Sequence, residues 1–308
     1  MQNSTTTTPS GWLAFELSIL HRLKFNSVAM PLTGDPAIGS YLKRRDIRVT
    51  SNDVLQSDWY RSLAVIQNVS EKLSDDDVNA VLEDVYVPGY KPLNPALRNW
   101  FSETDAWWFD NIRRNLDRLN SPLKFAVATS LVLAVGDYVH SFDEKTRELR
   151  QPLSNVFRRL WTNLPEPVGS NQNNACQNKA PDEFIAESTG ELMFLRLPKA
   201  EIRTSEKDKQ AWREEWMRGG DYFWPDFNTA MGGTFGQPVE TKSQYLRLLE
   251  DALQRALHLT HWAVSHIETG FISAQEIADT IAKHRRVEAI YTKDFSELTG
   301  KKAVIITA

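Results

Sequence analysis

The chain of 308 residues carries 36 Lys and Arg against 40 Asp and Glu, which gives a formal net charge of -4. This balance excludes a general electrostatic attraction to nucleic acid, so any such contact requires a local basic surface. Because Cys176 is the single cysteine, an internal disulfide and a thiolate zinc site are excluded, and no metal is expected. The polar start and the lack of an apolar run of 18 residues predict a cytoplasmic protein without a membrane span.

The first part of the chain alternates helical and strand patterns. Apolar residues at helical spacing predict a helix within 11–24. The stretch "SVAMPL" (27–32) reads as a strand, "AIGSYLKRR" (37–45) as a helix and "DIRVTSND" (46–53) as a second strand. A strand, a helix and a strand of these lengths predict a parallel pair joined by a right-handed crossover.

Helical patterns dominate the middle of the chain. They cover 73–86, 103–119, 123–142, 242–267 and 273–284. A stretch rich in Gly, Pro, Asn and Gln, between 163 and 238, predicts irregular structure. Two strand patterns, 286–294 and 301–308, follow at the end. We therefore predict an α/β domain formed by 1–68 and 286–308, interrupted by a mostly helical insert over 69–285.

The turn between the first two strands is the strongest candidate for a ligand site. Gly34 and Gly39 have the spacing of a phosphate-binding P-loop, but Ser40 and Tyr41 stand where that loop needs Lys and then Ser or Thr. A dinucleotide-binding turn needs three glycines at another spacing. An S-adenosylmethionine site is the third reading.

The residues of this turn support that third reading. The run "MPLTGDPAIG" (30–39), followed by Asn52-Asp53, resembles the cofactor motif of adenine-N6 DNA methyltransferases in which this motif precedes the target-recognition domain. "TPSGWLAFEL", "FSETDAWWFDNIRRNLDRL" and "VEAIYTKDFSEL" are similar, in order, to further stretches of that family. The resemblance implies a partial class I methyltransferase-like (Rossmann-like) parallel sheet, with 69–285 as a target-recognition domain.

The resemblance also implies which residues would hold S-adenosylmethionine. Asp53 would accept hydrogen bonds from the ribose hydroxyls, and Asp294 would accept one from the adenine amine. The full set of expected cofactor-binding residues is Gly11, Trp12, Pro31, Thr33, Gly34, Gly39, Asp53 and Asp294. Two departures weaken this site: Met30 replaces the acid of the family, and Pro36, which has no N–H, replaces a glycine.

The catalytic motif of the family is missing. Its fourth strand leads into (D/N)-P-P-(Y/F), which grips the target adenine, whereas "KKAVIITA" (301–308) resembles that strand and is followed by no such motif. We therefore expect no catalytic residue. The chain would then be a subunit of a split enzyme, or an inactive relative, from a restriction-modification system. An uncovered apolar strand invites pairing, so a second polypeptide or self-association is expected to cover 303–307. The alternative is a non-enzymatic nucleic-acid-binding or assembly protein with the same fold.

Aromatic and basic residues outside the turn are candidates for contact with double-stranded DNA. Aromatic rings can stack on bases, and arginines can contact phosphates. The candidates are Trp107, Arg113 and Arg114 in one helix, and Tyr222, Trp224 and Asn228 in the glycine-rich stretch. Aromatic residues at such positions equally suit a helix-packing core. His258 and His261 could form part of a metal site, but such a site needs a third ligand.

Overall fold

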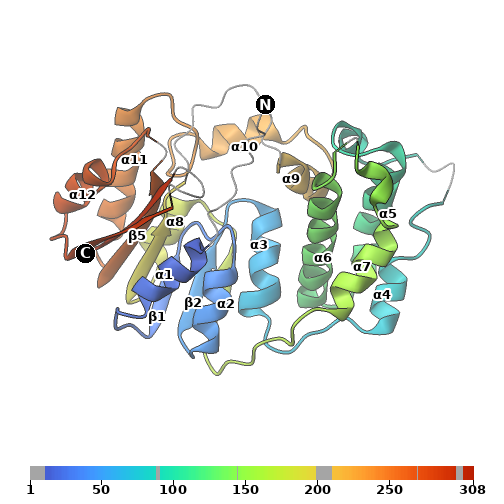
Figure 1. Cartoon of the computed structure of the whole chain (residues 1–308), viewed down its shortest axis with the longest axis horizontal. Coiled ribbons are helices and arrows are strands. Elements are labelled where there is room, and N and C mark those ends of the chain that lie inside the picture. The colour runs from blue at the N-terminus through green and yellow to red at the C-terminus, as the bar shows by residue number, and fades with distance from the viewer. Residues whose placement is uncertain (1–10, 88–90, 144, 199–209, 269, 296–300) are drawn as a thin grey trace. The chain divides into compact units, whose positions relative to one another are not determined.

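The computed structural model describes residues 11–87, 91–143, 145–198, 210–268, 270–295 and 301–308. It is a mixed α/β protein whose chain divides into two compact units (Figure 1). The sheet unit comprises 1–54, 171–205 and 231–308. The helical unit comprises 55–170 and 206–230. The chain therefore passes between the two units four times.

One seven-stranded sheet, with the order β3-β2-β1-β4-β5-β7-β6, organises the sheet unit. Its strands are β1 (Ser27–Met30), β2 (Arg48–Asn52), β3 (Ala175–Gln177), β4 (Leu192–Arg196), β5 (His261–Glu268), β6 (Ala289–Asp294) and β7 (Lys302–Thr307). The first five are mutually parallel, with Val28 opposite Val49 on one side and Leu192 on the other. Only β7 runs antiparallel to its neighbours, β5 and β6.

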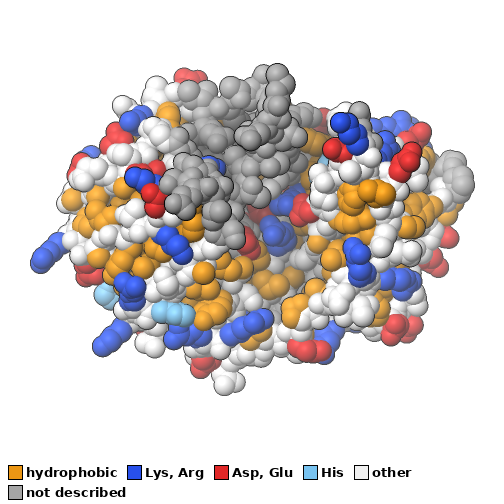
Figure 2. All heavy atoms as spheres, in the orientation of Figure 1, with side chains coloured by type: hydrophobic (Ala, Val, Ile, Leu, Met, Phe, Trp, Pro, Cys, Tyr) orange, Lys and Arg blue, Asp and Glu red, His pale blue; other side chains and the backbone are white. Residues whose placement is uncertain are grey.

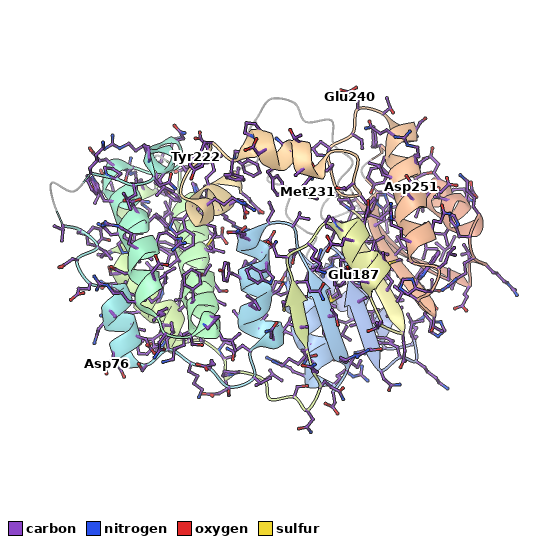
Figure 3. All side chains as sticks on the ribbon, turned by 180° about the vertical axis from the view of Figure 1, so that it is seen from behind. Asp76, Glu187, Tyr222, Met231, Glu240 and Asp251 are labelled. Carbon is purple, nitrogen blue, oxygen red and sulfur yellow. The ribbon has the colours of Figure 1, made fainter. Side chains whose placement is uncertain are left out.

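Helices cover both faces of this sheet. Helices α1 (Trp12–Leu20) and α2 (Ala37–Arg44) lie on the face turned to the viewer in Figure 1. Helices α8 (Pro181–Glu187), α11 (Lys242–Arg255) and α12 (Ala274–Ala282) belong to the opposite side, where Figure 3 shows α8 and α11 in front of the strands. Alternate residues of β4, Met193 and Leu195, pack into the core with these three helices. The period-2 alternation of the strands thus fills two separate layers.

The structure corrects the predicted sheet. The sheet is not partial, because β3, β4 and β5 all lie within the stretch 69–285 that was predicted as a helical insert. Residues 302–307 do not form the fourth strand: they form β7, which pairs with β5 on one side and β6 on the other. The prediction that another polypeptide or a second copy covers 303–307 is therefore wrong, because strands of the same chain already do so.

The helical unit is built around aromatic side chains. Its α-helices are α3 (Gln56–Ser62), α4 (Asp75–Val81), α5 (Glu103–Asn115), α6 (Pro122–His140), α7 (Leu153–Thr162) and α9 (Ala211–Arg218). A π-helical turn (Leu63–Gln67), three 3-10 turns (Pro95–Asn99, Leu116–Arg118, Arg147–Leu149) and most of helix α10 (Trp224–Met231) also belong to its described residues. Phe101 stacks on Phe109 with ring centroids 4.2 Å apart, and Trp212 meets both rings edge-on. Helix α10 (Trp224–Met231) forms where irregular structure was predicted.

Helix α6 is long and apolar enough to cross a membrane by length and composition alone. More than half of its most apolar window is buried within the protein, however. Its buried residues include Leu131, Val132 and Val135, and it contacts α3 and α7 of the helical unit. Helix α6 is therefore a core helix of the helical unit. Its apolar stretch is also the feature from which the sequence predicts a helix.

The contacts at the N-terminus of α12 predict how the stability of the folded protein changes at low pH. The Ser273 backbone N–H and the Lys242 ammonium bond the Glu276 carboxylate, at 2.9 Å each, and lower the pKa of Glu276 from 4.5 to about 2. Because the folded-state pKa is depressed, this stabilisation is complete above about pH 5 and is lost as the pH falls towards 2. We expect Glu276→Gln to lower the urea midpoint at pH 6, with the difference from the wild type disappearing near pH 2. A constant difference from pH 6 to pH 2 would contradict this linkage.

Candidate functional site

The carboxyl ends of the parallel strands meet at one edge of the sheet. At this edge, the strand order reverses between β1 and β4, because the chain proceeds to β2 and β3 on one side and to β4 and β5 on the other. Ligands of open α/β sheets bind in the crevice formed at such a reversal. We use "the crevice" only as a name for this region, which is where the strand order predicts a ligand to bind and which contains the turn 31–36, the end of β2 and the end of β4.

The turn after β1 is fixed to the end of β2 by hydrogen bonds. Thr33 donates its backbone N–H to the Asn52 carbonyl at 3.1 Å, and its buried hydroxyl lies 3.3 Å from the carbonyl oxygens of Met30 and Asn52. Gly34 has a φ of +59°, a left-handed conformation that favours glycine. A Cβ on Gly34 would meet no atom of the described residues within 4 Å, so these residues leave the space beside it open.

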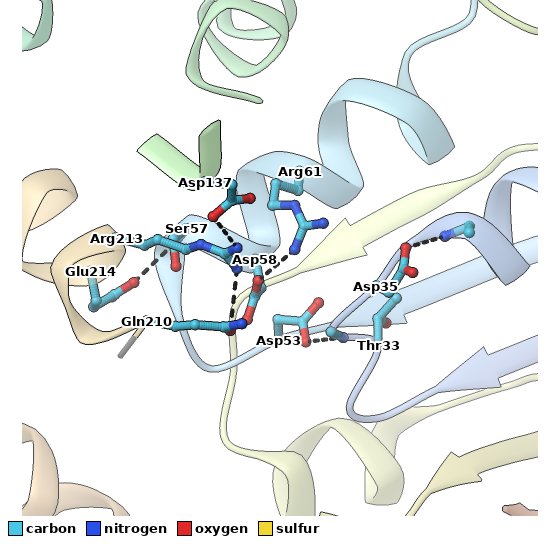
Figure 4. A network of polar contacts seen from close by, with 12 residues as sticks. Thr33, Asp35, Asp53, Ser57, Asp58, Arg61, Asp137, Gln210, Arg213 and Glu214 are labelled. Atoms are coloured by element: carbon cyan, nitrogen blue, oxygen red, sulfur yellow. Dashed lines mark hydrogen bonds and ion pairs between the residues drawn. The ribbon is translucent and has the colours of Figure 1, made fainter. Parts of the chain in front are cut away.

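Asp53 connects the two parts of the crevice. It directly follows β2 and is only 5% exposed, and its Oδ1 accepts a hydrogen bond from the Gly34 N–H at 2.9 Å (Figure 4). Its backbone is also fixed, because its N–H donates to Gln177 and its carbonyl accepts from the Asn178 amide. The structure therefore brings together the glycine and the acid that the sequence singled out.

The start of α2 carries its own carboxylate. Asp35 accepts a hydrogen bond from the Ala37 N–H at 3.0 Å, and Pro36 is the residue that caps the helix. The negative Asp35 side chain and the absent N–H of Pro36 both make this helix start a poorer anion site than a glycine-rich one. Met30, the last residue of β1, is buried and offers no acceptor to a ligand amine.

A buried ion pair from β4 and α1 was not predicted. Arg196, the last residue of β4, donates its Nε and Nη2 to the Glu16 carboxylate at 3.0 and 2.8 Å. Glu16 has no exposed surface and also accepts from the Ser265 hydroxyl at 2.8 Å. Its place among the buried apolar residues of α1 was the one signal in the sequence that could have revealed it.

The same arginine holds the turn. The Nη1 of Arg196 donates to the carbonyl oxygens of Thr33 and Asp35, at 3.1 and 3.0 Å. The guanidinium therefore lies at the reversal point of the sheet, fixed between α1 and the turn. Because an arginine only donates hydrogen bonds, this group shapes the crevice without adding an acceptor to it.

The chain is similar to the type II methyltransferase M2.HphI of Haemophilus parahaemolyticus. The identity is 22% over 321 aligned positions, which cover 94% of this chain and 90% of the relative. No protein-family model matches the chain. A distant similarity over most of both chains, together with the strand order of the sheet, supports a methyltransferase-like protein.

The other expected cofactor residues of the N-terminal part lie around the same α/β unit. Gly11, with a φ of +87°, precedes α1, and Trp12 begins that helix as a buried residue. The carbonyl of Pro31 accepts from the Asn52 amide at 3.0 Å, while Gly39 is buried within α2. Among these residues, Pro31 is bonded to the end of β2 through its carbonyl, whereas Trp12 and Gly39 occupy packed helical positions.

The structure places Asp294 away from the crevice. It is the last residue of β6, opposite Lys302 of β7. Strands β4, β5 and β7 lie between β6 and β1, so Asp294 does not accompany Asp53. The expectation that both acids hold one cofactor is therefore wrong. It rested on the similarity of "VEAIYTKDFSEL" to a stretch of the family, whereas residues 289–294 of that stretch form β6 at the far edge of the sheet.

The candidate DNA-contacting residues all belong to the helical unit. On α5, Trp107 is half-buried, Arg113 pairs with Asp117 at 3.0 Å, and Arg114 bonds Asn111. Arg113 also lies over the Phe125 ring, 5.4 Å from its centroid. These arginines are therefore committed to contacts within the unit.

The other three candidates lie at or near α10. Tyr222, labelled in Figure 3, is 76% exposed. Asn228 is also exposed. Trp224 differs, because its indole N–H donates to the buried Glu215 carboxylate at 3.0 Å. Contact with DNA stays a prediction. Tyr222 and Asn228 are exposed enough to make such a contact.

A network of charges orders one region of the helical unit (Figure 4). The buried Glu214 accepts from the backbone N–H groups of Gln56 and Ser57, at 3.0 Å each, and so caps α3. Burial raises the pKa of Asp58, although the neighbouring Arg61 and Arg213 guanidinium groups oppose this shift. These contacts join α9 to α3, so they have a structural role. No group of three His, Cys, Asp or Glu side chains suited to a metal ion occurs among the described residues.

Proposed function

We propose that the protein is a DNA adenine-N6 methyltransferase-like protein that binds S-adenosylmethionine in the crevice and lacks the catalytic motif. The observation that carries the proposal is the hydrogen bond between Asp53 and Gly34 at the reversal point of the sheet. It joins the two residues that the resemblance assigns to cofactor binding. The similarity to a type II methyltransferase supports the same assignment.

The residues of the crevice fit the ribose of the cofactor. A carboxylate has two oxygens with about four acceptor positions, so Asp53 can hold Gly34 and still accept from a ribose hydroxyl. The open space beside Gly34 leaves room for close approach of a ligand. S-adenosylmethionine would supply an activated methyl group, and the role of this chain would be to bind and orient it.

The end of β4 supports the lack of catalysis. In the resembling family, the fourth strand leads into D-P-P-Y, where an acid or amide accepts from the adenine amine. Here the sequence at this position is Arg196-Leu197-Pro198. Arginine has no acceptor, and this side chain is already bonded to Glu16 and to the turn. We therefore assign no catalytic residue, and methyl transfer would require a partner that supplies the motif.

The second candidate is a non-enzymatic nucleic-acid-binding or assembly protein. The ion pair between Arg196 and Glu16 favours it, because it rigidifies the crevice without offering ligand acceptors. In both candidates the helical unit is the proposed DNA-contacting part. Acidic residues outnumber basic ones in this unit, so DNA would have to meet a local surface such as that near Tyr222.

The cofactor proposal predicts a specific response to substitutions of Asp53. Calorimetry with S-adenosylmethionine and S-adenosylhomocysteine should detect binding to the wild type. We expect Asp53→Asn to weaken binding about tenfold, because its amide oxygen can still accept from Gly34 while the charge that favours the ribose is lost. Asp53→Ala should weaken binding further, since the turn loses its anchor. Asp251→Asn, an exposed substitution on α11, is the matched control and should leave binding unchanged.

Two outcomes separate the candidates. Absence of binding at millimolar concentrations of both ligands would exclude the cofactor proposal and favour the non-enzymatic protein. Binding without methyl transfer to DNA, followed with tritiated S-adenosylmethionine, would support the inactive or split enzyme. Methyl transfer by the chain alone would contradict the assignment of no catalytic residue.

A further inference from the structure

The single cysteine of the chain lies on β3, the outermost strand on one side of the sheet. Cys176 is the middle residue of this strand and is half-buried. Its partner on β2 is Ser51. Because paired residues of neighbouring parallel strands point to the same face of a sheet, the Cys176 thiol and the Ser51 hydroxyl lie side by side.

The strand register also shows which face of the sheet these two side chains occupy. Ala29 is paired with Thr50 on one side and with Met193 on the other, and Met193 packs with α8, α11 and α12. Ser51 follows Thr50, so it points to the opposite face. Helix α2 lies on that face and contacts β2. The thiol of Cys176 is therefore directed towards the layer that contains α2.

A buried lysine of α2 belongs to the same place. Figure 2 shows that Lys and Arg side chains over α1 and α2 reach the surface of this face. Lys43 differs, because its side chain is only 1% exposed and belongs, with Gly39 and Leu42, to the buried side of α2. Burial lowers the pKa of Lys43, whereas the nearby Cys176 opposes this shift. A thiolate is an anion that stabilises a buried ammonium, and Cys176 can supply it.

The hydroxyl of Ser51 is a second, independent sign of a missing group. Ser51 has no exposed surface, and within the described parts of the chain its Oγ has no hydrogen-bond partner. A buried hydroxyl without a partner is destabilising, so such a group indicates that a donor or acceptor belongs beside it. An oxygen atom bonded to the sulfur of Cys176 would be such an acceptor.

We propose that Cys176 is an oxidation site for hydroperoxides, where Lys43 promotes the reaction and Ser51 holds the product. The thiolate sulfur attacks one oxygen of the peroxide, so that an S–O bond forms while the O–O bond breaks. The sulfur is oxidised by two electrons to a sulfenic acid, and the peroxide is reduced. The leaving hydroxide takes a proton from the Lys43 ammonium and departs as water. The site goes beyond the proposed function and does not depend on it.

The test treats the full chain with hydrogen peroxide at about pH 6.5, traps the sulfenic acid with dimedone, and follows the adduct by mass spectrometry. Formation should be at least about tenfold faster in the folded chain than in the chain unfolded in urea, because a lysine beside a thiol commonly lowers its pKa by a unit or more. Lys43→Met should remove most of this difference. Ser51→Ala should leave the rate of formation within about twofold, but should shorten the lifetime of the sulfenic acid in the absence of dimedone about threefold or more.

Three variants serve as controls. Arg44→Met removes the exposed neighbour of Lys43 on α2 and should react like the wild type. Thr50→Ser, on the other face of β2, should keep the lifetime of the sulfenic acid, and Cys176→Ser should give no adduct. Equal rates in the folded and the unfolded wild type would overturn the proposal, as would equal losses in Lys43→Met and Arg44→Met. An unchanged lifetime in Ser51→Ala would overturn the role of Ser51.

Discussion

Replacing Arg196 by methionine should destabilise the sheet unit by about 3–5 kcal/mol, because it leaves the Glu16 carboxylate buried without its cation. Glu16 has no exposed surface, and Arg196 supplies two charge-assisted hydrogen bonds to it. The same change frees the carbonyl oxygens of Thr33 and Asp35. We therefore expect a lower urea midpoint together with faster amide exchange at Gly34, measured by hydrogen–deuterium exchange.

Two comparisons isolate the buried charge. The double variant Glu16→Leu/Arg196→Met should recover most of the loss, because it removes both members of the pair. Lys283→Met breaks an exposed pair with Glu250, at 2.6 Å, and should cost less than about 1 kcal/mol. A free energy of unfolding of Arg196→Met within 1 kcal/mol of the wild type would contradict the prediction. So would a double variant that is no more stable than Arg196→Met.

Gly136→Ala should destabilise the helical unit, although alanine favours a helix. A Cβ at position 136 would lie 2.0 Å from Cη2 and 2.4 Å from Cζ2 of Trp212. Trp212 is only 1% exposed and meets Phe101 and Phe109, so its ring has no free space to enter. Overpacking near the upper end of its usual cost, ~3 kcal/mol, exceeds the gain in helix propensity of ~1 kcal/mol. We expect a net loss of about 2 kcal/mol in the free energy of unfolding.

Gly169→Ala provides the matched control for this prediction. Gly169 also belongs to the helical unit, and a Cβ there would meet no atom within 4 Å. The free energy of unfolding of Gly169→Ala should stay within about 0.5 kcal/mol of the wild type. In a Trp212→Phe background, where the contacted ring atoms are gone, Gly136→Ala should be neutral or stabilising. A loss of the same size in both backgrounds would show that the close contact is not the cause.

The N-terminal α/β unit could be predicted from the sequence because its signals are local. Strand, glycine turn, helix and strand follow one another between 27 and 52, within one short stretch of the chain. The placement of Asp53 beside Gly34 follows from this order, since the ends of neighbouring parallel strands share one edge. A local signal of another kind is Ser74, which caps α4 because its side chain accepts from the Asp77 N–H.

The rest of the sheet could not be predicted because its signals are non-local. Strand β3 has three residues in a polar stretch, so it has no period of its own. Strand β5 follows α11 after a short connection without Gly or Pro, and its apolar residues extend the helical pattern. For β6 and β7, the residues predict strands correctly but say nothing about their neighbours or direction. The role of Arg196 could not be predicted either, because β4 lies in a stretch whose composition predicts irregular structure.

The bond between Arg196 and the Thr33 carbonyl also has a consequence for the order of assembly during synthesis. The two residues are 163 positions apart in the chain. At translation rates of 5–20 residues per second, roughly ten to thirty seconds pass between their appearance on the ribosome. During this interval, β1 lacks its neighbour β4 and Glu16 lacks its cation. The edge of β1 that later pairs with β4 therefore has to remain unpaired, or be shielded by a chaperone, while the whole helical segment 55–170 is made.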